Sequence, residues 1–185
     1  MTTVFIAGSM NIRNLDRKVQ ERIDNILKSG FDIVVGDADG ADAAVQEYLL
    51  ERGATKATVF CSGDAPRNNL GEWPVRTVDT NHAPGSRAFF TAKDLLMAEM
   101  ANFGLMVWDA KSTGTLSNVL ELLSRNKKCL VFVNKEKTFK TVSDVEQLED
   151  LLQYMSDNAK QKAEQKIKLL SRLDAMRHQQ SQMFA

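Results

Sequence analysis

The chain has 185 residues, of which 43% are hydrophobic and 26% are charged, and this composition excludes a disordered chain, a collagen and a disulfide scaffold. Its length predicts one domain, or one domain with an appendage. Lys plus Arg and Asp plus Glu both number 24, so the formal net charge is zero. Because a neutral chain lacks the global basic field of a sequence-independent DNA binder, we expect that nucleic acid is not its partner.

The cysteines, the histidines and the N-terminus predict a cytoplasmic protein. Cys61 and Cys129 both adjoin apolar runs and are expected to be buried thiols in a reducing compartment. The two histidines lie far apart, so we expect no Cys/His metal site, and we expect no cofactor. The N-terminus lacks the basic region of a signal peptide, and no apolar run reaches the length of a membrane span.

Short apolar runs alternate with longer amphipathic stretches along most of the chain. We predict strands at residues 3–7, 32–35, 56–61, 75–78, 104–108 and 129–133, and helices at 14–29, 43–52, 86–102 and 114–126. Strands separated by helices indicate βαβ units with right-handed crossovers. The predicted fold is therefore α/β, a Rossmann-like three-layer sandwich with a mostly parallel sheet. The segment 61–85 holds all three prolines and is expected to be a long functional loop.

The C-terminal part of the chain has a different composition, because neither glycine nor proline occurs from residue 143 onward. We expect helix over 144–180, with a break near 156–158. In its second half an apolar stripe is surrounded by lysines and arginines, which favours a docking or self-association helix; the alternative is a helix that packs on its own domain. We therefore divide the chain into a Rossmann-like ligand-binding domain, 1–140, and a helical extension, 141–185.

Polar turns follow the first two predicted strands, at the edge of a parallel sheet where ligands bind. The first turn holds Gly8, Ser9 and Met10, and its glycine would let the backbone approach a ligand. The second turn is acidic and is composed of Gly36, Asp37, Ala38, Asp39, Gly40, Ala41 and Asp42. Its carboxylates would accept hydrogen bonds from sugar hydroxyls, and Asp39 and Asp42 are candidate catalytic groups. The alternative is that these acids bind no ligand and are there only because the dipole of the following helix stabilises negative charge at its N-terminus.

A third turn precedes the predicted helix 114–126 and has the composition of a phosphate site. Its candidate ligand-binding residues are Asp109, Lys111, Ser112, Gly114 and Thr115. Open amides at a helix start, hydroxyls and a lysine together bind phosphate well, although Ser112 would also serve as a plain N-cap. Arg87 and Lys93, near the start of helix 86–102, are expected to contact the same anion, with a solvated surface position as the alternative.

In this order, the turns at residues 7–9, 36–42 and 112–115, with Met97 to Asn102 between them, resemble the SLOG superfamily. That superfamily has Rossmann-like domains and includes the Lonely Guy phosphoribohydrolases and the DprA-type and YspA-type proteins. The resemblance covers roughly residues 3–134. It implies a nucleotide-derived ligand with phosphate on Gly114 and Thr115, and a homodimer or larger homo-oligomer. Asn118, a further candidate ligand-binding residue that could hydrogen-bond a sugar hydroxyl, stands where the Lonely Guy enzymes carry their catalytic glutamate, so their hydrolysis is not implied.

The sequence thus predicts binding of a small-molecule nucleotide or nucleotide derivative at the carboxyl ends of the strands, with cleavage of an N-glycosidic bond as an additional activity. Two alternatives stay open: a dedicated nucleoside or nucleotide N-glycoside hydrolase or transferase, and an interaction protein with a vestigial pocket. Whether the chain is an enzyme is left undecided at this point.

Overall fold

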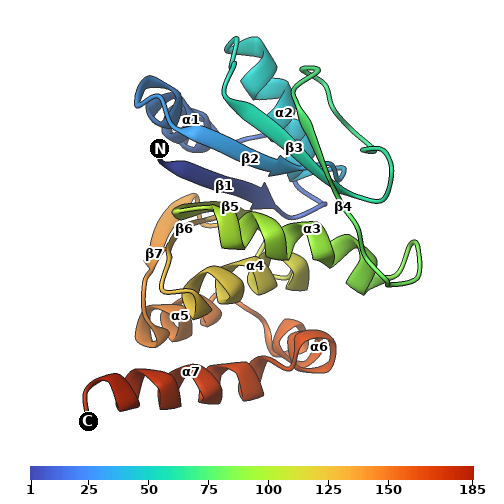
Figure 1. The fold of residues 1–185 in the computed structure, drawn as a ribbon. Helices are drawn as coiled ribbons and strands as arrows, with labels where there is room; N and C mark the ends of the chain where they lie inside the picture. Colours follow the sequence, from blue (N-terminus) through green and yellow to red (C-terminus); the bar gives the residue numbers. More distant parts are fainter.

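A computed structural model describes residues 1–185 and contains one seven-stranded sheet with the order β4-β3-β2-β1-β5-β6-β7 (Figure 1). The strands are β1 (Thr3–Gly8), β2 (Asp32–Gly36), β3 (Ala57–Ser62), β4 (Val75–Val78), β5 (Phe103–Trp108), β6 (Lys128–Val133) and β7 (Thr138–Val142). The helices are α1 (Arg17–Lys28), α2 (Ala41–Glu51), α3 (Arg87–Met100), α4 (Thr113–Ser124), α5 (Val145–Leu152), α6 (Asp157–Ile167) and α7 (Leu169–Met183). All neighbouring strands pair in parallel except β6 and β7, so the predicted Rossmann-like α/β fold is confirmed.

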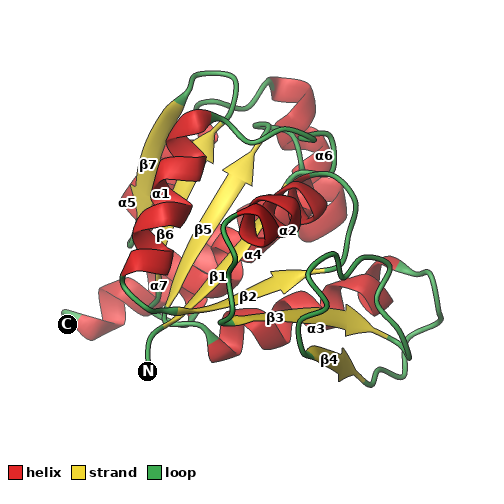
Figure 2. Cartoon of the chain, turned by 90° about the horizontal axis from the view of Figure 1, so that it is seen from above, coloured by secondary structure: helices red, strands yellow, loops and turns green.

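Alternation along each strand creates the two layers of core that flank the sheet. Val4 and Ile6 of β1 belong to a cluster of 17 buried residues beneath α1 and α2. Phe5 and Ala7 point to the other face and join 28 buried residues contributed largely by α3, α4 and the C-terminal helices. Figure 2 shows α1 and α2 lying on the near face of the sheet and α3 on the far face. Burial on both faces explains why these strands are continuous apolar runs.

The sequence analysis did not predict the last strand, β7, and it predicted only one of the two breaks that divide the C-terminal helices. β7 pairs antiparallel with β6 through a tight turn in which Lys137 has φ of 52°. Only one of its five residues, Val142, is buried, and its sequence is not an apolar run, so no hydrophobic pattern marks it as a strand. The predicted helix break is confirmed, since Ser156 caps α6 by accepting a hydrogen bond from the Ala159 amide. A second break was missed because Lys168, although not a glycine, adopts the left-handed conformation (φ 52°).

The C-terminal helices pack on the sheet domain, which was the alternative considered for them. Ala159 and Ala163 of α6 are buried in the same core cluster as α4, together with Leu173 of α7. The guanidinium of Arg172 donates to Ser117 Oγ (3.1 Å) and to Glu121 Oε1 (2.8 Å), both on α4. The division of the chain at residue 140 stays a prediction.

Both cysteines are buried and unpaired, as predicted from their apolar neighbours. Burial raises the pKa of the Cys61 and Cys129 thiols, so both are protonated near neutral pH. None of the helices combines the length and the hydropathy required to cross a lipid bilayer.

Candidate functional site

A cavity of about 690 Å³ opens at the carboxyl edge of the sheet. Its walls are the turns after β1, β2 and β5, the N-terminal halves of α3 and α4, and one side of α6. From β1 the chain continues to β2 and β3 on one side of the sheet, and later to β5 and β6 on the other side. Ligands of open α/β sheets bind at the carboxyl ends of the strands where the strand order reverses in this way. Of the residues singled out from the sequence, those that line the cavity are Gly8, Met10, Asp42, Arg87, Lys93, Asp109, Lys111, Ser112, Gly114, Thr115 and Asn118.

The other five candidates, Ser9, Gly36, Asp37, Asp39 and Gly40, lie behind or beside the cavity wall. Ser9 is fully buried, shares a hydrogen bond with the Thr115 hydroxyl (3.3 Å) and accepts one from the Asp109 amide (3.1 Å). It therefore ties the turn after β1 to the start of α4. The exposed Asp39 accepts a hydrogen bond from Asn68 Nδ2 (2.9 Å).

A buried group of charges forms the floor of the cavity beneath the end of β2. Lys93 on α3 is 3% exposed, and its ammonium donates to Asp94 Oδ1 at 2.7 Å and lies 4.0 Å from Asp37 Oδ1. Asp42 accepts a long hydrogen bond from the Ala38 amide (3.4 Å), while its Oδ1 has no partner. A Cβ at Gly36 would lie 2.4 Å from Asp42 Oδ2 and 2.9 Å from Lys93 Nζ, so only glycine leaves room for this pair.

Burial raises the pKa of Asp42 to about 7, although the positive charge of Lys93 acts in the opposite direction. For Lys93, burial alone would lower the pKa, but the carboxylates of Asp94 and Asp42 raise it overall. Lys93 is therefore a permanent cation near neutral pH, whereas Asp42 changes its charge there.

Asp37 is engaged by an arginine that the sequence analysis did not identify. Arg67 donates through Nη2 to Oδ1 (2.8 Å), and through Nε and its backbone amide to Oδ2 (3.1 and 3.0 Å). Burial would raise the pKa of Asp37, but these hydrogen bonds lower it below its ordinary value. The carboxylate is therefore ionised, and both of its oxygens already accept hydrogen bonds from Arg67. Asp37 is thus not free to bind a sugar hydroxyl, which was its expected role. The Arg67 guanidinium also lies over the Phe90 ring, 4.5 Å from its centroid.

The N-terminus of α4 forms the opposite wall. Ser112 caps the helix by accepting from the Thr115 amide (3.4 Å), and Asp109 accepts from the amides of Lys111 and Ser112 (2.9 and 2.7 Å). The first-turn amides of Thr113 and Gly114 have no acceptor within the helix. Such amides, at the positive end of the helix dipole, bind anions.

The cavity is positively charged although the chain is neutral. Its lining contains six basic side chains (Arg67, Arg87, Lys93, Lys111, Lys162 and Lys166) and three acidic ones (Asp42, Asp94 and Asp109). Lys93 and Arg67 are paired with carboxylates, but the other four cations form no ion pair. One of these, Arg87, donates instead to the Thr113 hydroxyl (3.1 Å), which holds its charge beside the start of α4.

The lining residues that the sequence analysis did not identify include Arg67, Phe90, Lys162 and Lys166. Arg67 lies in the irregular segment after β3, where no periodicity indicates which side chains turn inward. The two α6 lysines have the pattern of an ordinary solvated helix face, because only the packing of α6 on α4 brings them to the cavity.

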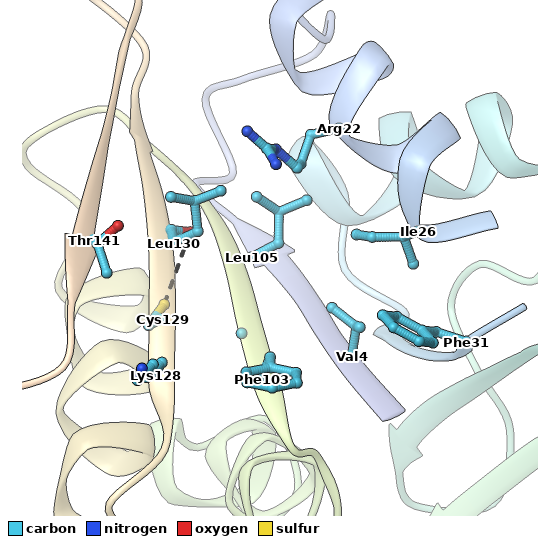
Figure 3. Close-up of a pocket in the computed structure, with 11 residues that line it drawn as sticks. Val4, Arg22, Ile26, Phe31, Phe103, Leu105, Lys128, Cys129, Leu130 and Thr141 are labelled. Atoms are coloured by element: carbon cyan, nitrogen blue, oxygen red, sulfur yellow. Dashed lines mark hydrogen bonds between the residues drawn. The ribbon is translucent and has the colours of Figure 1, made fainter. Parts of the chain in front are cut away.

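A second cavity, of about 230 Å³, lies at the amino edge of the sheet between α1 and β6 (Figure 3). Apolar side chains such as Val4, Leu105 and Leu130 dominate its lining, with Arg22 and Lys128 as the charged members. It lacks the convergent polar groups that mark the larger cavity.

The turn after β2 is pressed against the turn after β1, and this contact can be tested at Gly40. Gly40 has φ of +79°, and a Cβ there would lie 2.1 Å from the Met10 carbonyl oxygen. Gly53 has φ of +65° with nothing within 4 Å, so it is a matched control. We expect Gly40→Ala to lower the free energy of unfolding in urea by about 3 kcal/mol or more and Gly53→Ala by about 1 kcal/mol. Equal losses would contradict the close contact of the two turns.

Comparison with known proteins gives one informative likeness. No protein-family model and no curated protein matches the chain. Among solved structures, DNA processing protein A from Helicobacter pylori matches with a TM-score of 0.56 and 19% sequence identity, over 90% of this chain and 80% of that one. That protein is described by its single-stranded DNA binding mode. The likeness is one of fold, and at that level it agrees with the resemblance to DprA-type proteins.

The likeness corrects the predicted ligand and partner. A small-molecule nucleotide was expected and nucleic acid was judged an improbable partner, yet a protein of this fold binds single-stranded DNA. The exclusion was wrong because it used the net charge of the whole chain, whereas binding depends on where the charges lie. Here four unpaired cations gather around one cavity while the balancing acids lie mostly elsewhere.

Proposed function

We propose that this chain binds single-stranded DNA across the carboxyl edge of its sheet, with a backbone phosphate on the first turn of α4. The observation that carries the proposal is the open N-terminus of α4, with the unpaired cations Arg87 and Lys111 in the same cavity lining. Arg87 and Lys111 flank the free amides of Thr113 and Gly114, so one phosphate would receive both hydrogen bonds and charge. The order of the polar turns further supports placing the chain in the SLOG superfamily.

A site for single-stranded DNA needs a flat surface for the bases as well as contacts to phosphate, and Arg67 and Phe90 provide that surface. Phe90 is half-buried in the cavity wall, with the guanidinium of Arg67 against it. Asp37 fixes that guanidinium through two hydrogen bonds, so the plane is held in place. Bases stack on aromatic rings and on arginine planes without sequence preference.

Fluorescence anisotropy with a labelled 12-nucleotide oligothymidylate tests the proposal. The logarithm of the binding constant should fall as the logarithm of the salt concentration rises, with a slope of about −0.7 for each phosphate contacted. Arg87→Ala/Lys111→Ala should weaken binding about tenfold or more at 50 mM salt and make the slope shallower by about 0.7, because one phosphate contact is lost.

Lys28→Ala/Lys128→Ala is the control, since it removes the same charge from exposed positions outside this cavity. It should bind like the wild-type protein. Absence of salt-dependent binding, or equal losses in the two double variants, would refute the proposal.

A further inference from the structure

α6 belongs to the C-terminal extension, yet it forms part of the cavity wall. Figures 1 and 2 both show it on the side of the molecule where the parallel strands end. Its contribution to the lining is Lys162 and Lys166 alone; Asp157 and Glu164 of the same helix do not line the cavity. Because the two lysines are four residues apart, they lie on one side of the helix about 6 Å apart along its axis.

The packing of α6 fixes the position of these lysines. Ala159 and Ala163 are 5% and 0% exposed, and their small side chains let α6 approach α4 closely. Ser156 caps the start of α6, and Glu164 near its end accepts a hydrogen bond from the Leu170 amide of α7 (2.7 Å). α7 is itself attached to α4 through Arg172. The helix that carries the first phosphate site thus also supports the second pair of cations.

We propose that Lys162 and Lys166 form a second phosphate contact, so that the site takes a strand with successive internucleotide phosphates rather than a single phosphate. This inference rests on the proposed function. Neither lysine forms an ion pair, and both side chains are exposed at the cavity rim, so their charge is available to a ligand. A strand whose first phosphate lies on α4 would continue along α6, where two ammonium groups follow its backbone.

The test compares Lys162→Gln/Lys166→Gln with Lys28→Gln/Lys160→Gln, a control that removes two lysines outside the cavity, one of them on the same helix. For a labelled 12-nucleotide oligothymidylate, the first variant should lose about tenfold in affinity at 50 mM salt, with a salt slope shallower by about 0.7. For thymidylyl-thymidine, which has one phosphate and is measured by competition, it should differ from wild type by less than twofold. The control should match wild type with both probes.

The outcomes separate this inference from the proposed function. If Arg87→Ala/Lys111→Ala weakens binding of the long oligonucleotide while Lys162→Gln/Lys166→Gln does not, the α6 contact is refuted and the proposed function stands. Equal losses with the short and long probes would also refute it, because the lysines would then act on the first phosphate. If the wild-type protein binds neither probe, both proposals fail.

Discussion

Replacing Lys93 with methionine is expected to lower the free energy of unfolding by about 3–5 kcal/mol at pH 8, the loss typical of breaking a buried ion pair from one side. Lys93 is 3% exposed and lies among the carboxylates of Asp94, Asp42 and Asp37. Methionine fills a similar volume but leaves these acids without their shared cation. Urea denaturation at pH 5 and pH 8 measures the effect.

The loss at pH 5 should be smaller than the loss at pH 8. The pKa of Asp42 is about 7 because the group is buried, so at pH 5 it is neutral and no longer needs the cation. In the double variant Lys93→Met/Asp42→Asn the loss should be smaller than in Lys93→Met and should depend less on pH. A loss below about 1 kcal/mol, or one that Asp42→Asn leaves unaltered, would show that the buried charges do not depend on Lys93.

Asp42→Asn alone is expected to remove much of the dependence of stability on pH between pH 5 and pH 8. An unperturbed aspartate has a pKa of about 3.9, whereas burial raises that of Asp42 to about 7. Between these values the folded state binds the proton more strongly than the unfolded state. The free energy of unfolding of the wild-type protein therefore falls as pH rises through this window, by up to roughly 4 kcal/mol from this group.

Denaturation of the wild-type protein, Asp42→Asn and Asp39→Asn across this pH range checks the expectation. Asp39 is exposed, so Asp39→Asn should follow the wild-type profile. The stability advantage of Asp42→Asn should grow with pH. Parallel curves for the wild-type protein and Asp42→Asn would mean that Asp42 is ionised without cost in the folded protein.

Much of the lining of the candidate site could be predicted because parallel strands bring their carboxyl ends to one edge of the sheet. Gly8, Asp42 and Gly114 are distant in sequence, yet each lies at or after the carboxyl end of a buried strand, and all three line the same cavity. Apolar runs locate such strands, and glycine or polar residues locate the turns. The parallel topology alone then brings these turns together at one edge of the sheet, so their proximity can be predicted without knowing any side-chain contact.

The remaining features depend on contacts that no local pattern reveals. Asp37 and Asp42 belong to the same acidic turn, but only the structure shows that Arg67, from a segment without periodicity, donates hydrogen bonds to the Asp37 carboxylate. Lys162 and Lys166 resemble Lys160 in every local respect, and only the orientation of α6 on α4 distinguishes them. Composition likewise reports total charge and not the place where unpaired cations collect.

Backbone amide chemical shifts during titration of the ¹⁵N-labelled protein with a 12-nucleotide oligothymidylate measure the central contact most directly. We predict the largest changes at Thr113 and Gly114, whose amides in the first turn of α4 would donate hydrogen bonds to the phosphate, with smaller changes at Lys111 and on α6. Changes confined to the apolar cavity around Val4 and Leu105 at the amino edge, or no changes at saturating oligonucleotide, would contradict it.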